Sequence, residues 1–142
     1  MNEVVCVLYL FCSQVFPMGN YVPNREGVFR FGVPVVALLA HNYLDGRYFN
    51  QIEIGDVVRY YGSEIKDYKV KWIVKMQTLD PGNPYSLYNE NGVINTPDDI
   101  WRRFYVRDGL LFQTCIEKDG LSTWGIMFIF AEEYGHPTAR FN

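Results

Sequence analysis

The sequence predicts a single, mostly β domain: a barrel or sandwich of seven or eight strands with one or two short helices. Hydrophobic residues make up 49% of the 142 residues, enough to bury one packed core. Aromatic residues make up 17%, including 11 Tyr and 10 Phe, and these residue types favour strands. Short apolar runs separated by Gly, Pro, Asn and Asp recur along the chain, which is typical of strands joined by turns.

Composition also excludes several classes of function. The net charge is −3 and no run of like charge occurs, so we expect no nucleic-acid partner. Two histidines without closely spaced Cys or Asp neighbours predict neither a metal site nor a cofactor. The cysteine count is three, an odd number, and a strand would hold Cys6 and Cys12 about 20 Å apart. That separation exceeds disulfide reach, so these two are expected to be buried, inert thiols.

The first apolar run, residues 4–12, is expected to form a buried strand. A membrane-spanning helix needs about 20 apolar residues, which is more than this run contains. A signal peptide carries basic residues before its apolar run, whereas Glu3 is the only charge here. An unprocessed export signal is the alternative interpretation. Because the run is short and lacks preceding basic residues, we expect no membrane anchor. The protein is then expected in the cytoplasm or in a larger assembly.

The next apolar segments predict two strands and a hairpin. Residues 28–31 form a short strand, and 35–40 form a buried one that delivers His41 at its end. A helical turn is expected within 48–52. Strands over 57–61 and 68–76, joined by a Gly-Ser turn, form a hairpin with one wet side. The alternation along its second strand places four apolar residues on one face: Val70, Trp72, Val74 and Met76.

A long loop over 80–95 is expected next, and loops of this length are usually functional. Thr96 then caps a short helix over 97–105. Pro takes its first position, and Asp98 and Asp99 lie at the positive end of its dipole, so they are cap residues rather than paired catalytic acids. We expect five aromatic residues in this region to pack the helix on the sheet rather than to line a peptide groove. They are Tyr85, Tyr88, Trp101, Phe104 and Tyr105.

A buried strand over 110–116 carries Cys115 near its end. After a turn over 117–120, a last strand runs from 123 to 132, and 134–142 is a tail that includes His136. Side chains alternate along a strand, so Cys115 shares a face with Leu111 and Gln113. That face becomes polar as the strand ends, which favours a thiol that looks into a groove.

Two segments resemble sortases, and together with the last strand the resemblance covers residues 28–133. Ala40-His41-Asn42, followed by an aromatic residue and the Ile-Gly-Asp of residues 54–56, resembles the segment that carries the sortase histidine. Leu111-Phe112-Gln113-Thr114-Cys115 resembles the nucleophile motif, which ends in Thr-Cys. Trp124-Gly125 and the apolar run after it resemble the strand that follows.

This resemblance implies a closed β-barrel of about seven to eight strands around a groove that binds a peptide or protein substrate. It implies a cysteine transpeptidase or peptidase that acts on a peptide sorting motif. Cys115 would attack a backbone carbonyl to form a thioacyl intermediate, which an amine or water resolves. His41 would protonate the leaving amine, and an ordinary thiol would need a nearby imidazolium to be ionised at neutral pH.

One position departs from the family pattern. Alignment of the last strand places Ile126 where sortases have a catalytic arginine, and loss of one such donor typically costs about 10²–10³ in rate. Arginines elsewhere could supply the group: Arg102, Arg103, Arg107 and Arg140. The alternative is a catalytically inactive sortase fold that serves as a structural subunit, a homo-oligomer or a peptide- or protein-binding module of a larger assembly.

Overall fold

The structure is a computed structural model, and we describe only part of the chain. The described residues are 4–7, 14–15, 22–23, 27–29, 35–40, 42, 45–61, 65–83 and 85–135. Three residues named above, His41, His136 and Arg140, lie outside these ranges, as do Cys12 and the side chain of Cys6.

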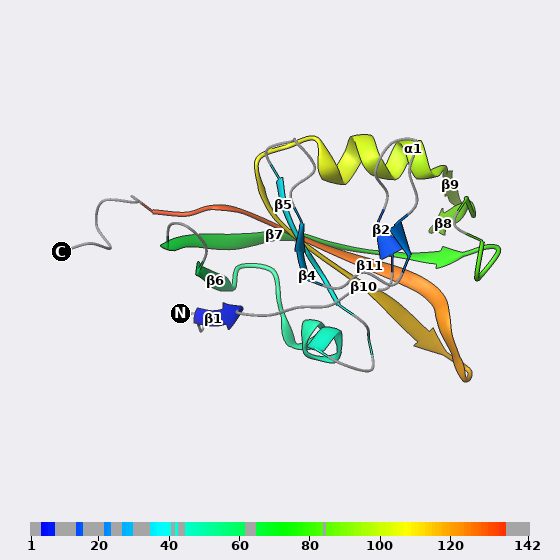
Figure 1. Ribbon diagram of the computed structural model, residues 1–142, viewed down its shortest axis with the longest axis horizontal. Coiled ribbons are helices and arrows are strands. Elements are labelled where there is room, and N and C mark those ends of the chain that lie inside the picture. Colours follow the sequence, from blue (N-terminus) through cyan, green and yellow to red (C-terminus); the bar gives the residue numbers. More distant parts are fainter. Residues whose placement is uncertain are drawn as a thin grey trace.

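The described chain is mostly β, as the composition predicted, with one short α-helix (Figure 1). Its strands are β1 (Val4–Val7), β2 (Gln14–Val15), β3 (Val22–Pro23), β4 (Gly27–Phe29), β5 (Val35–Leu39), β6 (Val57–Tyr61), β7 (Ile65–Thr78), β8 (Tyr88–Glu90), β9 (Val93–Asn95), β10 (Gly109–Lys118) and β11 (Leu121–Glu133). The helical elements are the 3₁₀ helix η1 (Asp45–Gln51), the α-helix α1 (Pro97–Ile100) and the π-helical turn η2 (Trp101–Tyr105), which continues α1.

Nine of the described strands form one sheet, in the order β1-β6-β7-β11-β10-β5-β4, with the β8–β9 hairpin added beside β7. The strands β2 and β3 form a separate pair. Within the large sheet, β1 runs parallel to β6, and β5 runs parallel to β10. Strands β1 and β4 stand at opposite edges, so pairing among the described strands does not confirm the expected closed barrel.

The expected strands over 35–40, 57–61, 110–116 and 123–132 are confirmed, and the last two are longer than predicted. The strand expected over 4–12 is described as strand at Val4–Val7, and residues 8–13 lie outside the described ranges. No helix among the described residues is long and apolar enough to cross a membrane.

The prediction of a loop over 80–95 was wrong, because this segment contains the β8–β9 hairpin. Asn91 and Gly92 form its turn, with φ of 50° and 92°. Two consecutive positive φ angles match the right-handed twist of a hairpin, and Asn-Gly is the residue pair that adopts them most readily. The Gly92 N–H donates to Asn89 Oδ1 at 2.8 Å, which holds the turn.

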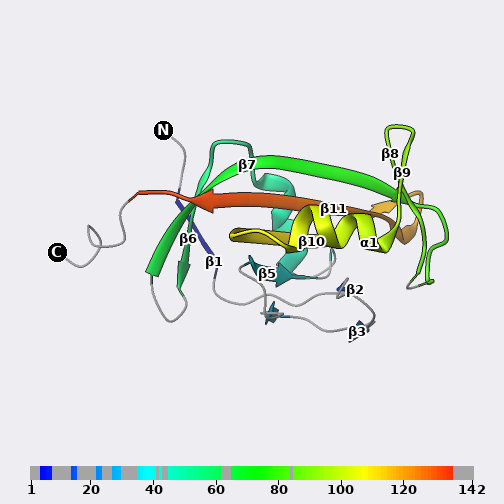
Figure 2. The same cartoon turned by 90° about the horizontal axis from the view of Figure 1, so that it is seen from above.

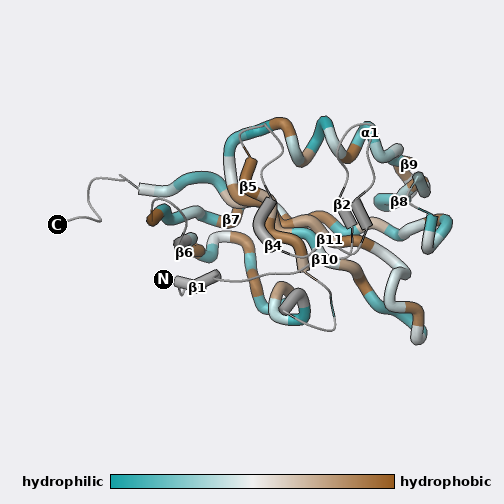
Figure 3. The backbone as a smooth tube through the Cα atoms, viewed as in Figure 1, coloured by the Kyte–Doolittle hydropathy of each residue, from teal (hydrophilic) through white to brown (hydrophobic). Residues whose placement is uncertain are grey.

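The core lies on both faces of the sheet, in two clusters. Figure 3 shows the hydrophobic residues gathered around β5 and the crossing strands β10 and β11. The α1–η2 helix covers one face and η1 lies against the other (Figures 1 and 2). The helix-side cluster includes Leu39, Val74, Met76, Phe104, Tyr105, Leu111, Ile126 and Phe128. The opposite cluster includes Leu38, Phe49, Val58, Val70, Phe112, Met127 and Ile129.

A register shift in β7 corrects one prediction. Trp72, Val74 and Met76 lie on the helix-side face as expected, but Val70 belongs to the opposite cluster. On β11, Phe130 pairs with Trp72 and the next residue, Ala131, pairs with Val70. The intervening residue of β7 is left without a partner there, and such a bulge exchanges the two faces of a strand.

Candidate functional site

Cys115 lies near the end of β10, where the strand passes out of the core. Its side chain is partly buried, and the strand becomes exposed two residues later. Its partner on β11 is Ile126, and directly opposed residues in an antiparallel pair share a face. Since Ile126 belongs to the helix-side cluster, the thiol lies on the face that the α1–η2 helix covers.

The parallel strand β5 places the segment before His41 beside the strand that carries Cys115. The five register pairs run from Val35 with Gly109 to Leu39 with Gln113. Beyond the last pair, the Ala40 N–H donates to the Gln113 carbonyl oxygen at 3.1 Å. Ala40 follows the last residue of β5 and precedes His41, and it is bonded to β10.

The residue after His41 also contacts the β10–β11 hairpin. Asn42 is half-buried, and its Nδ2 donates to the Ser122 carbonyl oxygen at 3.1 Å. Ser122 is the second residue of β11, the strand that follows the turn at Asp119 and Gly120. Both neighbours of His41 in the sequence are thus held against the end of the hairpin where Cys115 lies.

Ile126 faces this site with an apolar side chain. It is 2% exposed, so the position where the resemblance placed an arginine is part of the packed core. The described alternative arginines make other contacts. Arg102 lies 3.5 Å from Asp98, and Arg103 binds Glu90 through two contacts. Arg107 lies over the ring of Phe130, and the register partner of Phe130 on β10, Leu111, precedes Cys115 by four residues, roughly 13 Å along the strand.

A cation is present at the turn end of the β10–β11 hairpin. The ammonium of Lys118, three residues after Cys115, lies 4.8 Å from the centre of the Trp124 ring. Trp124 is half-buried and precedes Ile126 by two residues on β11. Contacts of this kind between a cation and an exposed aromatic ring are worth about 0.5–1 kcal/mol. The charge is solvated, so it acts on the thiol weakly.

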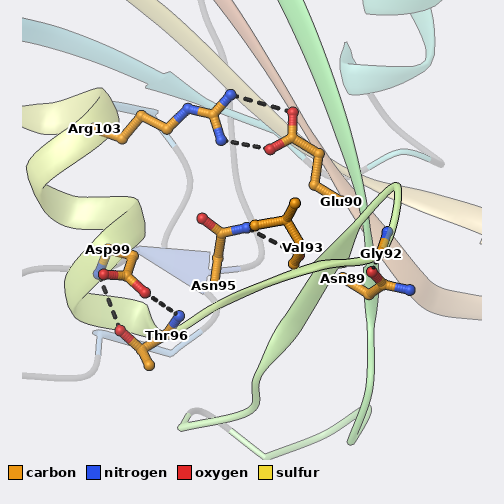
Figure 4. Close-up of polar contacts among 8 residues, drawn as sticks. All are labelled: Asn89, Glu90, Gly92, Val93, Asn95, Thr96, Asp99 and Arg103. Atoms are coloured by element: carbon orange, nitrogen blue, oxygen red, sulfur yellow. Dashed lines mark hydrogen bonds and ion pairs between the residues drawn. The ribbon is translucent and has the colours of Figure 1, made fainter.

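The α1–η2 helix is held at its start and again at Arg103, as Figure 4 shows. At its start, Asp99 N–H donates to Thr96 Oγ1 at 3.1 Å and Thr96 N–H donates to Asp99 Oδ2 at 2.9 Å, a reciprocal cap. The bonds from the Thr96 backbone and side chain, with a smaller contribution from Arg102, lower the pKa of the Asp99 carboxyl. Further along, Arg103 and Glu90 tie η2 to β8, at 2.5 and 3.1 Å.

The inner side of the helix packs on the sheet through aromatic rings. Phe104 stacks on Phe128 with ring centres 4.2 Å apart, and Trp101 stacks on Tyr105 at 5.1 Å. These residues and Tyr88 are buried in the helix-side cluster, which confirms the packing interpretation, whereas Tyr85 is 69% exposed. Arg103 is half-buried against Glu90.

Sequence reasoning missed two polar features beside the thiol. The Tyr105 hydroxyl donates to Gln113 Oε1, and both side chains are fully buried. On the opposite face, Thr114 Oγ1 is buried and has no hydrogen-bond partner among the described residues. A glutamine inside an apolar run was a visible signal that a buried partner would be needed.

Comparisons with known proteins give little guidance. No protein-family model matches the sequence, and no curated protein sequence matches it. Among solved structures, the chain is similar to sortase C of Streptococcus pneumoniae, with a TM-score of 0.48 and 12% sequence identity. The match covers 90% of this chain and 66% of the sortase chain.

Proposed function

We propose that this chain is a sortase-like cysteine transpeptidase or peptidase, in which Cys115 is the nucleophile and His41 transfers the proton. One observation carries the proposal. The difference in residue number between partners is the same for all five pairs of β5 and β10, and His41 and Cys115 differ by this same number. Two more residues in register would bring the two side chains together on one face, because neighbouring parallel strands lie about 4.8 Å apart.

The contacts on both sides of His41 support this continuation. Ala40 is bonded to Gln113 on β10, and Asn42 is bonded to Ser122 on β11. The proposal includes the finer architecture that the resemblance implies, a barrel that closes around the groove.

The chemistry follows from a thiol beside an imidazole. A positively charged imidazole favours the thiolate, and a thiolate is the reactive form of cysteine. The sulfur attacks a backbone carbonyl carbon of a peptide, an S–C bond forms and the C–N bond breaks. His41 gives its proton to the leaving amine. An incoming amine or water then attacks the thioester, loses its proton to the imidazole and restores the thiolate.

Ile126 favours a second function, the non-catalytic scaffold or binding module. A buried apolar residue opposite the thiol offers no hydrogen bond to the oxyanion that forms when sulfur attacks. Loss of one such donor costs about 3–4 kcal/mol in the barrier. The chain would then retain the fold and bind a peptide or protein partner, or another copy of itself, without cleaving it.

Trapping of the intermediate distinguishes these two functions. The chain is incubated with a mixed library of unstructured peptides, quenched in acid and searched by peptide mapping for a thioester on Cys115. If the chain is an enzyme, we expect an acyl adduct on Cys115 that disappears in Cys115→Ala and accumulates far less in His41→Ala. Cys6 and Cys12 serve as internal controls in the same digest. Peptides that bind without any adduct would support the scaffold and exclude the enzyme.

A further inference from the structure

Gln113 is a polar residue in the middle of an apolar strand. It follows Leu110, Leu111 and Phe112, and its side chain is 0% exposed. Burial of an amide is unfavourable unless its hydrogen bonds are replaced, so a glutamine at this depth depends on its contacts. A position where an element breaks its own apolar pattern is often part of a functional site.

The side chain of Gln113 is bonded to the helix on the same face of the sheet as Cys115. Tyr105, which is also 0% exposed, donates its hydroxyl hydrogen to Gln113 Oε1. Trp101 stacks on the Tyr105 ring at an interplanar angle of 7° and fixes it from the outer side. Tyr105 ends the π-helical turn η2, and such widened turns occur frequently at functional sites.

The backbone of Gln113 is bonded to the other half of the site. Its carbonyl oxygen accepts the N–H of Ala40, the residue before His41. Its register partner on β5 is Leu39, and Cys115 follows it by two residues on the same face of β10. Gln113 therefore joins the strand of the thiol, the end of the strand before His41 and the helix above them.

We infer that the Tyr105–Gln113 hydrogen bond positions Cys115 against His41, with Gln113 and Tyr105 as positioning residues that do not contact the substrate. The inference rests on the function proposed above. Without the hydroxyl, β10 is no longer tied to η2 at this point. The exit of the strand can then shift relative to β5, and the thiolate loses part of its stabilisation by the imidazolium.

Alkylation of Cys115 by iodoacetamide tests this, because its rate follows the thiolate fraction. Peptide mapping reads Cys115 separately from the other two cysteines, and the rate is measured against pH. Tyr105→Phe removes only the hydroxyl and keeps the ring. It is expected to lower the rate at neutral pH about tenfold, the lower end of the effects seen for hydrogen bonds that orient metal ligands, and to move the profile toward higher pH.

Two further variants separate positioning from general destabilisation. Phe104→Leu disturbs the same helix without touching Gln113, and it should leave the pH profile in place. Tyr105→Phe combined with Gln113→Met removes both polar partners. No buried polar group is then left without a hydrogen bond, so this variant is expected to fold. This double variant should show the same shifted profile as Tyr105→Phe alone.

The outcomes are distinct. The positioning role is overturned if the wild-type thiol reacts at lower pH than an ordinary cysteine and Tyr105→Phe gives the same pH profile as the wild type. The proposed function would then still stand. If the wild-type thiol reacts at the pH of an ordinary cysteine, the proposed function itself is overturned. A shift in Phe104→Leu as large as that in Tyr105→Phe also overturns the positioning role, because any loss of packing would then suffice.

Discussion

Gly125 offers a direct test of the strand register beside the candidate site. It precedes Ile126 on β11 and pairs with Gln77 on β7 and Ile116 on β10. A Cβ at this position would lie 2.5 Å from the carbonyl oxygen of Met76, and real Cβ atoms essentially never approach closer than 3.0 Å. Strands β7 and β11 would have to separate by at least about 0.5 Å to admit Gly125→Ala.

The cost follows from this geometry. Addition of a methyl group to a filled site, with displacement of backbone, typically costs about 1–3 kcal/mol. For a domain of this size, about 1 kcal/mol corresponds to a change in melting temperature of roughly 3 °C, so Gly125→Ala should lower it by about 3–10 °C. Calorimetry or circular dichroism measures this shift. Because the displaced residues adjoin Ile126 and Cys115, alkylation of Cys115 should also change.

Gly120→Ala is the matched control in the same hairpin. Its φ is +80° and a Cβ there would meet nothing within 4 Å, so the only penalty is that of a left-handed conformation. Stability falls, and the reactivity of Cys115 stays as in the wild type. A Gly125→Ala variant with unchanged melting temperature and reactivity would show that β7 and β11 do not meet in this register.

Three further predictions concern the elements around the thiol. The hydrogen bonds from Thr96 lower the folded-state pKa of the Asp99 carboxyl below its usual 3.8, so its contribution to stability is present above that value and is lost as the pH falls through the lowered pKa. In urea unfolding between pH 5 and 2, the stability of Asp99→Asn should therefore fall less with acid than that of the wild type. An equal fall in both proteins contradicts this. Phe104→Ala empties a fully buried position stacked on Phe128 and should cost about 3–5 kcal/mol in chemical unfolding; a cost below about 1 kcal/mol would mean that the helix does not pack there. Lys118→Gln removes a solvated charge, so alkylation of Cys115 at neutral pH should slow by less than about fivefold, and the difference should vanish in high salt. A larger or salt-independent loss of rate would assign Lys118 a direct role.

Apolar runs with clear ends predicted most of the sheet. The strands around Leu38, Val58, Phe112 and Ile129 carry enough local apolar sequence to be recognised without knowledge of their neighbours. The β8–β9 hairpin was missed because its strands are three residues each, and the only strong signal was the Asn-Gly turn. The change of face at Val70 could not be predicted, because the bulge is defined by pairing with β11, a strand distant in sequence.

The candidate site was predictable residue by residue but not as an arrangement. The sequence singles out Cys115 by its strand and motif, and places it on the same face as Gln113. The parallel register of β5 and β10 carries no local signal, since parallel strands are joined by long crossovers and are aligned only by tertiary packing. The bond between Tyr105 and Gln113 likewise depends on where the helix settles on the sheet.

The measurement that tests the Cys115–His41 pair most directly is the pH profile of Cys115 alkylation in the wild type and in His41→Ala. If His41 continues the register of β5, the wild-type thiol reacts at a pH below the value of about 8.5 that is usual for cysteine, and His41→Ala moves the profile up to that value. An identical profile in both proteins, centred on the usual value, would contradict the pairing of the two side chains.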